Sequence, residues 1–468
     1  MISGINQRSP YSNVQIVIMA NRPVFTRESF GDTQLFGLLP IANRPILGHL
    51  LEQFERSCFN NISLVCLRKD ENAYAELLLQ YTSHKVRLIP VEGVMTTCDI
   101  IRNKIGADNH IFLFPIDLLL SSNLTSIFDF HITSQSLITI ITSKFEVNEN
   151  DRKSTPGHKA ENLNANAGHR YFVFDDLDPT KLVTLLSDPN ALSEDLDLSL
   201  KQVTMNDMFT HESSSDSLGS EGSISNSDES MNINPELLNG FRSLTIDCSQ
   251  HLTGAYILSP DCISKLHDLT DVHSIESEFI PFLCQQSVEN NSLFRVDQSP
   301  LDKTRPASLF VTSQKEFAYR VTDYATLFIV NMKCASSKLN GFMPSANFIP
   351  LDGANAGYYM EGSVKAPTSF KYSLGCVYGE NMKVEEDVII RNSVIGRHCR
   401  FGKNTKVINS VLFDHVSVEE GATIKDSIVG SDSVIHANSN FMQCIIVPRY
   451  SCDRAVSRSA CIVQLGEK

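Results

Sequence analysis

Two arginines near the start of the chain, Arg22 and Arg44, lie in segments that are suited to binding an anion. Arg22 and its neighbour Asn21 follow an apolar stretch, residues 14–19, that the pattern predicts to be a buried strand. Arg44 lies about twenty residues further on, just before a second apolar stretch begins. A guanidinium offers a planar fork of donors that matches phosphate or carboxylate oxygens. These residues therefore form one candidate anion site, although a role as surface or subunit contacts explains both arginines equally well.

The order of these segments resembles the start of the nucleotidyltransferases that make nucleotide sugars. In that family the strand ends in a glycine-rich loop over the phosphates, and a Pro-Lys-Pro element follows it. Glycine suits such a loop because it reaches positive φ and lets backbone N–H groups approach the phosphates. Here the loop begins Ala20-Asn21-Arg22-Pro23, and Arg44 stands at the lysine position. The sequence thus predicts that the transferase fold is retained, whereas the residues with which the family binds phosphate are replaced.

Three further polar residues fall where the same family places its magnesium and base contacts. Asp117 follows the apolar segment 110–116 at a predicted strand end, the position of the family's magnesium-binding aspartate. Thr97 and Asp99 lie in a segment, 92–102, that resembles the family's base-binding turn. A single carboxylate is a weak magnesium site, so a helix N-cap or loop role is the alternative for Asp117, and an N-cap role is favoured for Thr97 or Asp99. No catalytic residue, metal or cofactor is predicted.

The composition is that of an ordinary globular protein: 468 residues, 42% hydrophobic and 20% charged, with a net charge of −14. That length predicts two domains, since single cores rarely exceed about 300 residues. The negative charge argues against broad contact with nucleic acid, and no apolar run approaches the roughly 18 residues that a membrane span needs. The twelve cysteines include no Cys-x-x-Cys pair, and Cys66 and Cys444 lie in apolar strands. We therefore expect buried thiols in the reducing cytosol.

The fold class predicted for the first domain is α/β, a Rossmann-like nucleotidyltransferase-type domain with a mostly parallel sheet. Helical segments such as 71–81 and 97–105 alternate with apolar strand candidates, which are residues 14–19, 62–67, 86–91, 110–116 and 137–142. Near-continuous apolar strands separated by helices indicate a parallel sheet that is covered on both faces. Ligands of such sheets bind beyond the carboxyl ends of the strands, where Ala20, Glu92 and Asp117 are expected to lie.

This first domain is predicted to span residues 14–340, after a flexible N-terminus at 1–13. It contains an insert, at about 190–236, that is rich in serine and acidic residues. The insert has too few apolar residues to form a core, so we predict that it is disordered. The remaining predicted parts are a linker at 341–371, a C-terminal domain at 372–450 and a tail at 451–468.

The C-terminal domain carries large apolar or aromatic residues at steps of six, six and five, so each triplet restarts after seventeen residues. Such spacing is typical of a parallel β-helix, in which every six-residue side turns one apolar residue inward. The pattern resembles the left-handed β-helix that follows many sugar-nucleotide transferase domains, with Gly396, Gly402 and Gly430 near corners. The predicted core positions are Tyr378, Val384, Ile390, Ile395, Phe401, Val407, Leu412, Val418, Ile424, Val429, Ile435, Phe441 and Ile446.

Four segments together resemble the gamma subunits of eukaryotic translation initiation factor 2B. They are LPIANRPIL from residue 39, ESEFIPFL from 276, VIGRHC from 394 and FDHVSVEEGATIKDSIV from 413. The resemblance extends over about 14–145 and 241–450, and its β-helix part is the most specific. Related epsilon subunits carry the exchange activity in an extension of paired helices, so the absence of such an extension favours gamma.

The resemblance implies a non-catalytic subunit of the guanine nucleotide exchange factor for initiation factor 2. Such a subunit would pair with the epsilon subunit through both domains, and the pair would dock on the alpha, beta and delta subunits in the cytosol. Initiation factor 2 would be the substrate of the whole complex, with no membrane and no direct nucleic acid contact. Two alternatives stay open: an active sugar-nucleotide pyrophosphorylase of the mannose-1-phosphate guanylyltransferase type, and a regulatory module that binds a nucleotide or sugar without turning it over.

Overall fold

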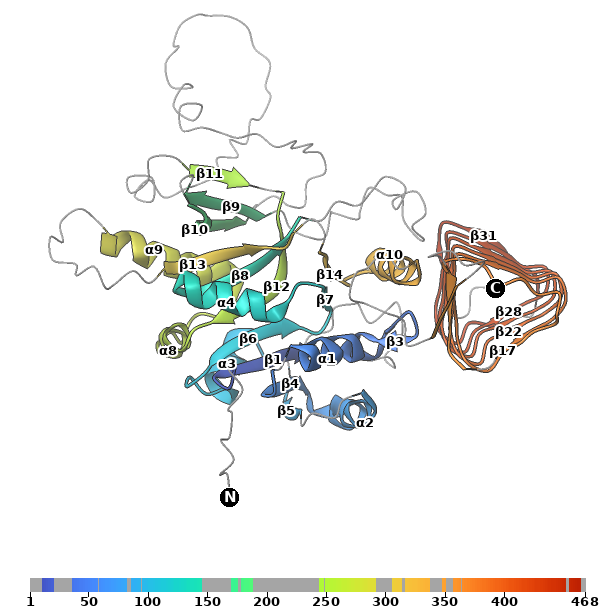
Figure 1. Ribbon diagram of the computed structural model, residues 1–468, viewed down its shortest axis with the longest axis horizontal. Helices are drawn as coiled ribbons and strands as arrows, with labels where there is room; N and C mark the ends of the chain where they lie inside the picture. Colours follow the sequence, from blue (N-terminus) through green and yellow to red (C-terminus); the bar gives the residue numbers. More distant parts are fainter. Residues whose placement is uncertain are drawn as a thin grey trace, which may run out of the picture.

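The computed structural model shows an N-terminal α/β domain packed beside a C-terminal β-helix (Figure 1). It describes residues 11–20, 36–57, 59–81, 86–93, 95–144, 170–175, 178–187, 244–247, 249–291, 305–313, 316–336, 347–350, 357–362, 364–451 and 454–463. The predicted disordered insert and residues 1–10 of the predicted flexible N-terminus lie outside these ranges. Within these ranges, no helix has the length and apolar character needed to cross a membrane.

A ten-stranded mixed sheet forms the centre of the N-terminal domain. Its strands, in spatial order, are β11 (Leu244–Asp247), β9 (Arg170–Asp175), β10 (Asp178–Ser187), β13 (Arg305–Val311), β8 (Ser136–Ser143), β12 (His251–Leu258), β6 (His110–Pro115), β1 (Val14–Ala20), β4 (Ile62–Leu67) and β5 (Arg87–Val91). The strands β6, β1, β4 and β5 run parallel to one another, which confirms the prediction for this part. The strand β12 instead pairs antiparallel with both β6 and β8, so the whole sheet is more mixed than predicted.

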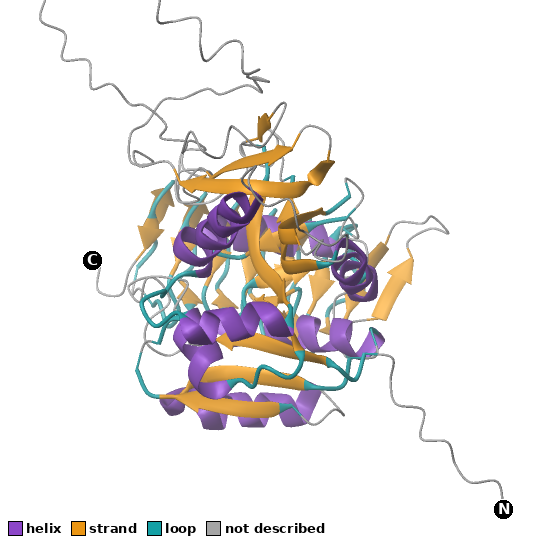
Figure 2. Ribbon diagram, turned by 90° about the vertical axis from the view of Figure 1, so that its left-hand side faces the viewer, coloured by secondary structure: helices purple, strands orange, loops and turns teal. Residues whose placement is uncertain are grey.

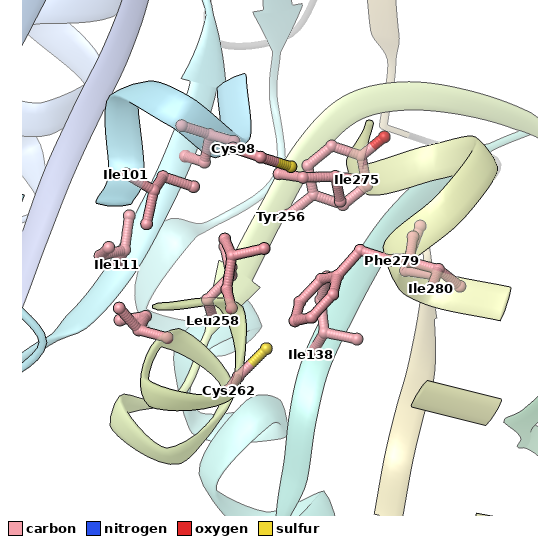
Figure 3. Packing of buried hydrophobic residues seen from close by; sticks show 14 of the residues in the cluster. Cys98, Ile101, Ile111, Ile138, Tyr256, Leu258, Cys262, Ile275, Phe279 and Ile280 are labelled. Atoms are coloured by element: carbon pink, nitrogen blue, oxygen red, sulfur yellow. The ribbon is translucent and has the colours of Figure 1, made fainter. Parts of the chain in front are cut away.

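Helices cover both faces of this sheet, as Figure 2 shows. The described helices are α1 (Ile46–Arg56), α2 (Glu71–Tyr81), α3 (Thr97–Lys104), α4 (Leu124–Ser134), α8 (Pro260–Asp268), α9 (Ile280–Asn291), which follows a π-helical turn at Ile275–Phe279, and α10 (Tyr324–Ala335). Successive residues of β1 divide between two cores. Ile16 and Ile18 belong to the cluster that includes residues of α1, α2 and α4, whereas Val17 belongs to the cluster that includes residues of α3, α8 and α9. Figure 3 shows part of this second cluster, with Cys98 of α3, Cys262 of α8 and Ile280 of α9. Burial on both faces explains why these strands are almost continuously apolar.

Two short strand pairs lie at the edge of this domain that faces the β-helix. The first pair is antiparallel and joins β7 (Leu118–Leu120) to β14 (Ala318–Arg320). The second is a tight hairpin of β2 (Pro40–Ile41) and β3 (Arg44–Pro45), here called the 40–45 hairpin. In Figure 1, β3 and α10 are the elements drawn nearest to the β-helix.

The C-terminal domain is a three-sided, left-handed parallel β-helix, seen nearly along its axis in Figure 1. Its strands are β16 (Gly357–Met360), β18 (Val377–Tyr378), β21 (Val394–Ile395), β24 (Val411–Leu412), β27 (Ile428–Val429), β30 (Ile445–Ile446) and β32 (Ile462–Val463) on side one; β17 (Val364–Lys365), β19 (Met382–Val384), β22 (Arg400–Phe401), β25 (Ser417–Val418) and β28 (Val434–Ile435) on side two; β20 (Ile389–Arg391), β23 (Lys406–Ile408), β26 (Thr423–Lys425), β29 (Asn440–Met442) and β31 (Ser457–Ser459) on side three. Residues seventeen positions apart stack, as Tyr378 does on Ile395 and Ile395 on Leu412. All thirteen predicted core positions lie in one buried cluster.

The β-helix is longer than predicted at both ends. The strand β16 pairs with β18, so the first coil lies inside the predicted linker 341–371, where β15 (Asn347–Pro350) also pairs with β16. The strands β31 and β32 continue sides three and one into the predicted tail 451–468. Both extensions depart from the seventeen-residue apolar pattern, so the pattern did not predict them. At the first coil the register is eighteen, with Tyr359 opposite Val377, and at the last coil Arg458 occupies the position that stacks on Phe441.

The corners of the β-helix depend on residues that tolerate positive φ. Asn, Asp and His supply most of these positions, and their short polar side chains suit a left-handed backbone. Along one corner, Asn392 Nδ2 donates to Asn409 Oδ1 at 2.7 Å, and Asn409 Nδ2 donates to Asp426 Oδ1 at 2.6 Å. The glycines serve a different purpose. A Cβ on Gly396 would lie only 2.5 Å from the backbone carbon of Phe413 in the next coil.

Replacing Gly396 by alanine should therefore lower the free energy of unfolding by about 1–3 kcal/mol, the usual cost of overpacking, because the clashing atoms belong to backbone. Gly106→Ala is the matched control, since the new Cβ would meet nothing closer than 4.0 Å. Chemical denaturation of both variants measures the difference. Equal stability of the two would contradict the close approach of successive coils.

Candidate functional site

The predicted pocket residues take part in separate networks rather than in one site. Asn21 and Arg22 lie outside the described residues. Asp117 follows β6 and pairs with Arg320, whereas Thr97 and Asp99 belong to the first turn of α3. Arg44 lies in the 40–45 hairpin, where its contacts are to α1. Each network shows what these side chains do in the folded chain.

Asp117 forms a buried ion pair with Arg320, a partner that the sequence analysis did not identify. Arg320 Nη2 donates to Asp117 Oδ2 at 2.7 Å, and Arg320 Nε lies 3.2 Å from both carboxylate oxygens. The carboxylate has no exposed surface, whereas the Arg320 side chain is 34% exposed. Burial raises the pKa of the Asp117 carboxyl, and the facing guanidinium opposes this shift. Burial likewise disfavours the charged guanidinium, but the carboxylate outweighs it and raises the pKa of Arg320. Asp117 therefore lies in a turn and pairs with Arg320 rather than capping a helix, which confirms the loop alternative, and its role as a magnesium ligand stays a prediction.

The backbone around Asp117 holds this pair in place. Strand β14 carries Arg320 past β7, with Arg320 opposite Leu118, and Val321 N–H donates to the carbonyl of Asp117 at 2.9 Å. Gly254, with φ of +72°, lies beneath the guanidinium, and a Cβ there would approach Arg320 Nη1 to 3.1 Å. A glycine far away in the sequence thus makes room for the arginine. No local pattern around residue 117 could have predicted either partner.

The first turn of α3 is capped by Thr96, so the prediction that Thr97 or Asp99 is the N-cap was wrong. Thr96 Oγ1 accepts a hydrogen bond from the Asp99 N–H at 3.2 Å and donates its own proton to Asp99 Oδ2 at 2.6 Å. This hydrogen bond is the main reason that the pKa of Asp99 lies below its usual value. Arg102 Nη1 pairs with Asp99 Oδ1 at 2.8 Å, and Arg102 Nε reaches Leu266 O on α8 at 3.0 Å. The network fastens α3 to α8.

Arg44 belongs to a strained turn rather than to an open anion site. The two central residues of the 40–45 hairpin, Ala42 and Asn43, have φ values of 47° and 67°, the pattern of a type I′ turn. Positive φ is unfavourable for alanine, so neighbouring contacts must hold this conformation. The Arg44 guanidinium forms a salt bridge with Glu52 on α1. That contact engages one guanidinium nitrogen, Nη1, which an anionic ligand would otherwise use.

Asn331 on α10 supplies one of the contacts that hold the turn. Its side chain is completely buried. Its Oδ1 accepts from the Ala42 N–H at 2.8 Å, and its Nδ2 donates to Leu327 O at 2.9 Å. His49 on α1 lies on the other side, with Nε2 at 3.1 Å from Ile41 O. Burial lowers the pKa of His49 to about 4, so its neutral ring donates this hydrogen bond at neutral pH.

The tip of the 40–45 hairpin docks on the β-helix. Asn43 Nδ2 donates to Ile395 O at 2.8 Å, and Arg397 Nη2 donates to Asn43 O at 3.1 Å. Arg397 also forms a two-point ion pair with Glu361, with both N–O distances at 2.9 Å. The polar groups of Asn43 are therefore hydrogen-bonded to groups of the β-helix, as buried polar groups require.

An apolar column completes the contact between the domains. It consists of outward-facing residues of side one, here called the outer column: Val377, Val394, Val411, Ile428 and Ile445. These residues share one buried cluster with Leu327, Phe328 and Val330 of α10 and with Ile41 and Ala42 of the hairpin. Side one is thus apolar on both of its faces, and the N-terminal domain covers the outer one.

The sequence does carry a signal for this contact. On side one each inward residue follows a second apolar residue, in Val-Tyr, Val-Ile, Val-Leu, Ile-Val and Ile-Ile pairs. On side two the corresponding residues are Lys383, Arg400, Ser417 and Val434, so only one of the four is apolar. A strand that is buried on both faces loses its apolar and polar alternation. The doubled pairs therefore mark the side that another element covers.

A small polar hollow lies beside the hairpin. It is lined by residues 120–123, by Ser57 and by four residues of α1, which are His49, Glu52, Gln53 and Arg56, and its volume is about 210 Å³. Pockets for small-molecule ligands usually have volumes of about 300–1,000 Å³. Among the described residues, no cluster of three His, Cys, Asp or Glu side chains is arranged to hold a metal ion.

A comparison with family models matches residues 355–455 to the EIF2B subunit epsilon LbH domain. The C-terminal domain is therefore similar to an eIF2B left-handed β-helix domain. This match confirms the predicted resemblance at the level of the β-helix domain, and it includes the first coil from Gly357. It is to the epsilon subunit, so the gamma assignment stays a prediction. A comparison with curated proteins found no match.

Replacing Arg320 by methionine should lower the free energy of unfolding by about 3 kcal/mol, because it leaves the fully buried carboxylate of Asp117 without its partner. Adding Asp117→Asn to this variant should recover most of the loss, since the uncompensated charge disappears. Denaturant unfolding of the two single variants and the double variant completes the cycle. Strictly additive effects would contradict the ion pair.

Proposed function

We propose that this chain is a non-catalytic subunit, of gamma type, of the guanine nucleotide exchange factor for initiation factor 2. The observation that carries the proposal is the similarity of residues 355–455 to an eIF2B β-helix domain, which is docked on an α/β domain. The chain would pair with the epsilon subunit and, through it, join the alpha, beta and delta subunits in the cytosol. The assembled complex would promote GDP release and so translation initiation.

Arg44 and Asp117 of the predicted pocket are paired with other side chains of the same chain. This pairing supports a scaffold role rather than the pyrophosphorylase alternative. Arg320 binds both oxygens of Asp117, at the strand end where a transferase would hold magnesium. Arg44 stands at the family's lysine position, but Glu52 engages its guanidinium. The hairpin that carries Arg44 is packed between α10 and the β-helix. Phosphate binding would have to break these contacts first.

The free sides of the β-helix suit a protein partner. Side three exposes Ile389 and Met442, at 37% and 39%, among the cationic side chains of Lys406 and Lys425. The outer column on side one is already covered by the N-terminal domain, so side three is the surface of the solenoid that we assign to the epsilon subunit.

The test measures release of fluorescent GDP from initiation factor 2. The purified chain alone should leave the release rate unchanged, whereas the chain purified together with an epsilon subunit should give faster release than epsilon alone. Acceleration by the single chain would contradict the gamma assignment. Failure to co-purify with epsilon would contradict the pairing.

Two measurements on the same purified chain test the two alternative functions, the pyrophosphorylase and the regulatory module. Incubation with GTP, mannose-1-phosphate and magnesium should give no turnover, and ordinary enzymatic rates would overturn the scaffold role. Calorimetric titration with GTP, ATP and GDP-mannose tests the regulatory module. Binding that is lost in Arg44→Ala would favour that module.

A further inference from the structure

One column of the β-helix holds small polar or sulfur-containing residues at every coil. Its members, seventeen residues apart, are Cys376, Ser393, Ser410, Ser427, Cys444 and Cys461. Each serine hydroxyl donates a hydrogen bond to a backbone carbonyl of its own coil and accepts one from a backbone N–H of the next coil. Ser427 Oγ, for example, donates to Lys425 O at 2.6 Å and accepts from the Cys444 N–H at 3.0 Å. At the C-terminal end of the column, cysteines take the place of the serines in two successive coils.

The geometry of these two thiols favours a covalent link. The sulfur atoms of Cys444 and Cys461 lie 3.7 Å apart. Their coils are in register, with Ile445 opposite Ile462 and the Ile445 N–H bonded to Cys461 O at 3.0 Å. Neighbouring strands lie about 4.8 Å apart, which falls within the Cα separation of about 4.4–6.8 Å that disulfides adopt.

The two thiols differ in access to solvent. Cys444 is completely buried, whereas Cys461 is partly exposed. Burial raises the pKa of the Cys444 thiol to about 11, which makes it a poor first nucleophile at neutral pH. An oxidant from solution therefore meets Cys461 first. This arrangement of an accessible thiol beside a resolving thiol is that of a redox-sensitive pair.

We propose that Cys444 and Cys461 are a redox modification site that closes to a disulfide and ties the last described coil to the coil before it. The co-reactant is a low-molecular-weight disulfide such as glutathione disulfide. Cys461 loses its proton and attacks this disulfide, forming a mixed disulfide and releasing one glutathione thiolate. Cys444 then attacks the Cys461 sulfur, and its proton leaves with the second glutathione. Two protein thiols are oxidised, and one glutathione disulfide is reduced to two glutathiones.

The link would stabilise the end of the β-helix against fraying. The last described coil, residues 454–463, has a neighbouring coil on one side only among the residues that the structure describes. A bond from Cys461 to the buried Cys444 would anchor this coil to the core. Oxidation would thus act on the stability of the coil without altering the contacts of the outer column.

The test treats the folded full-length chain with glutathione disulfide, blocks remaining thiols, and digests the unfolded product with trypsin. Cleavage after Lys425, Arg449, Arg454 and Arg458 places Cys444 and Cys461 on different peptides. The expected result is a linked pair of peptides 426–449 and 459–468 that dithiothreitol separates. Backbone amides of β32 should also exchange hydrogen several-fold more slowly in the oxidised chain.

Two variants and one internal control sharpen this result. In Cys444→Ser, Cys461 should stop at the stable mixed disulfide with glutathione, whereas Cys461→Ser should leave Cys444 unmodified. Cys376 is the control, since it is buried in the same column but faces Ser393; it should stay unmodified. Linkage of peptide 426–449 to Cys452 instead, the absence of any linked peptide, or equal modification of Cys376 would overturn the proposal.

Discussion

The outer column on side one of the β-helix is the constraint on which the arrangement of the two domains depends. A free β-helix turns apolar residues inward only, but this one also turns Val377, Val394 and Val411 outward on side one. Removing that surface from water requires a second apolar surface, and α10 and the 40–45 hairpin supply it. The solenoid and the α/β domain are consequently parts of one packed unit.

This constraint changes the role of a segment that resembles part of a nucleotide site. The 40–45 hairpin bears Arg44 where transferases carry a lysine, yet its tip contacts Ile395 and Arg397. Its left-handed residue Ala42 is held by Asn331. Strain of this kind persists only where surrounding contacts fix it. The contacts here come from α10 of the same domain and from the β-helix, so the hairpin serves assembly of the fold.

Much of the fold could be predicted from the sequence because it follows from local periodicity. The seventeen-residue period identified thirteen buried positions, and apolar runs identified the parallel strands. The antiparallel direction of β12 and both end coils were not predicted. Strand direction leaves no periodic signal, the register at Tyr359 is eighteen, and Arg458 occupies an apolar position of the pattern in the last coil. The candidate site was less predictable. Asp117 and Arg320 are 203 positions apart, and only the folded chain brings them together.

Hydrogen exchange of the wild type and of Asn43→Gly tests whether the hairpin fastens the two domains. Glycine keeps the positive φ of the turn but removes the side-chain hydrogen bond to Ile395 O. In Asn43→Gly, α10 and side one of the β-helix should exchange faster, whereas β1, β4 and β6 should keep their protection. Identical exchange of α10 and side one in both proteins would contradict this role of the hairpin.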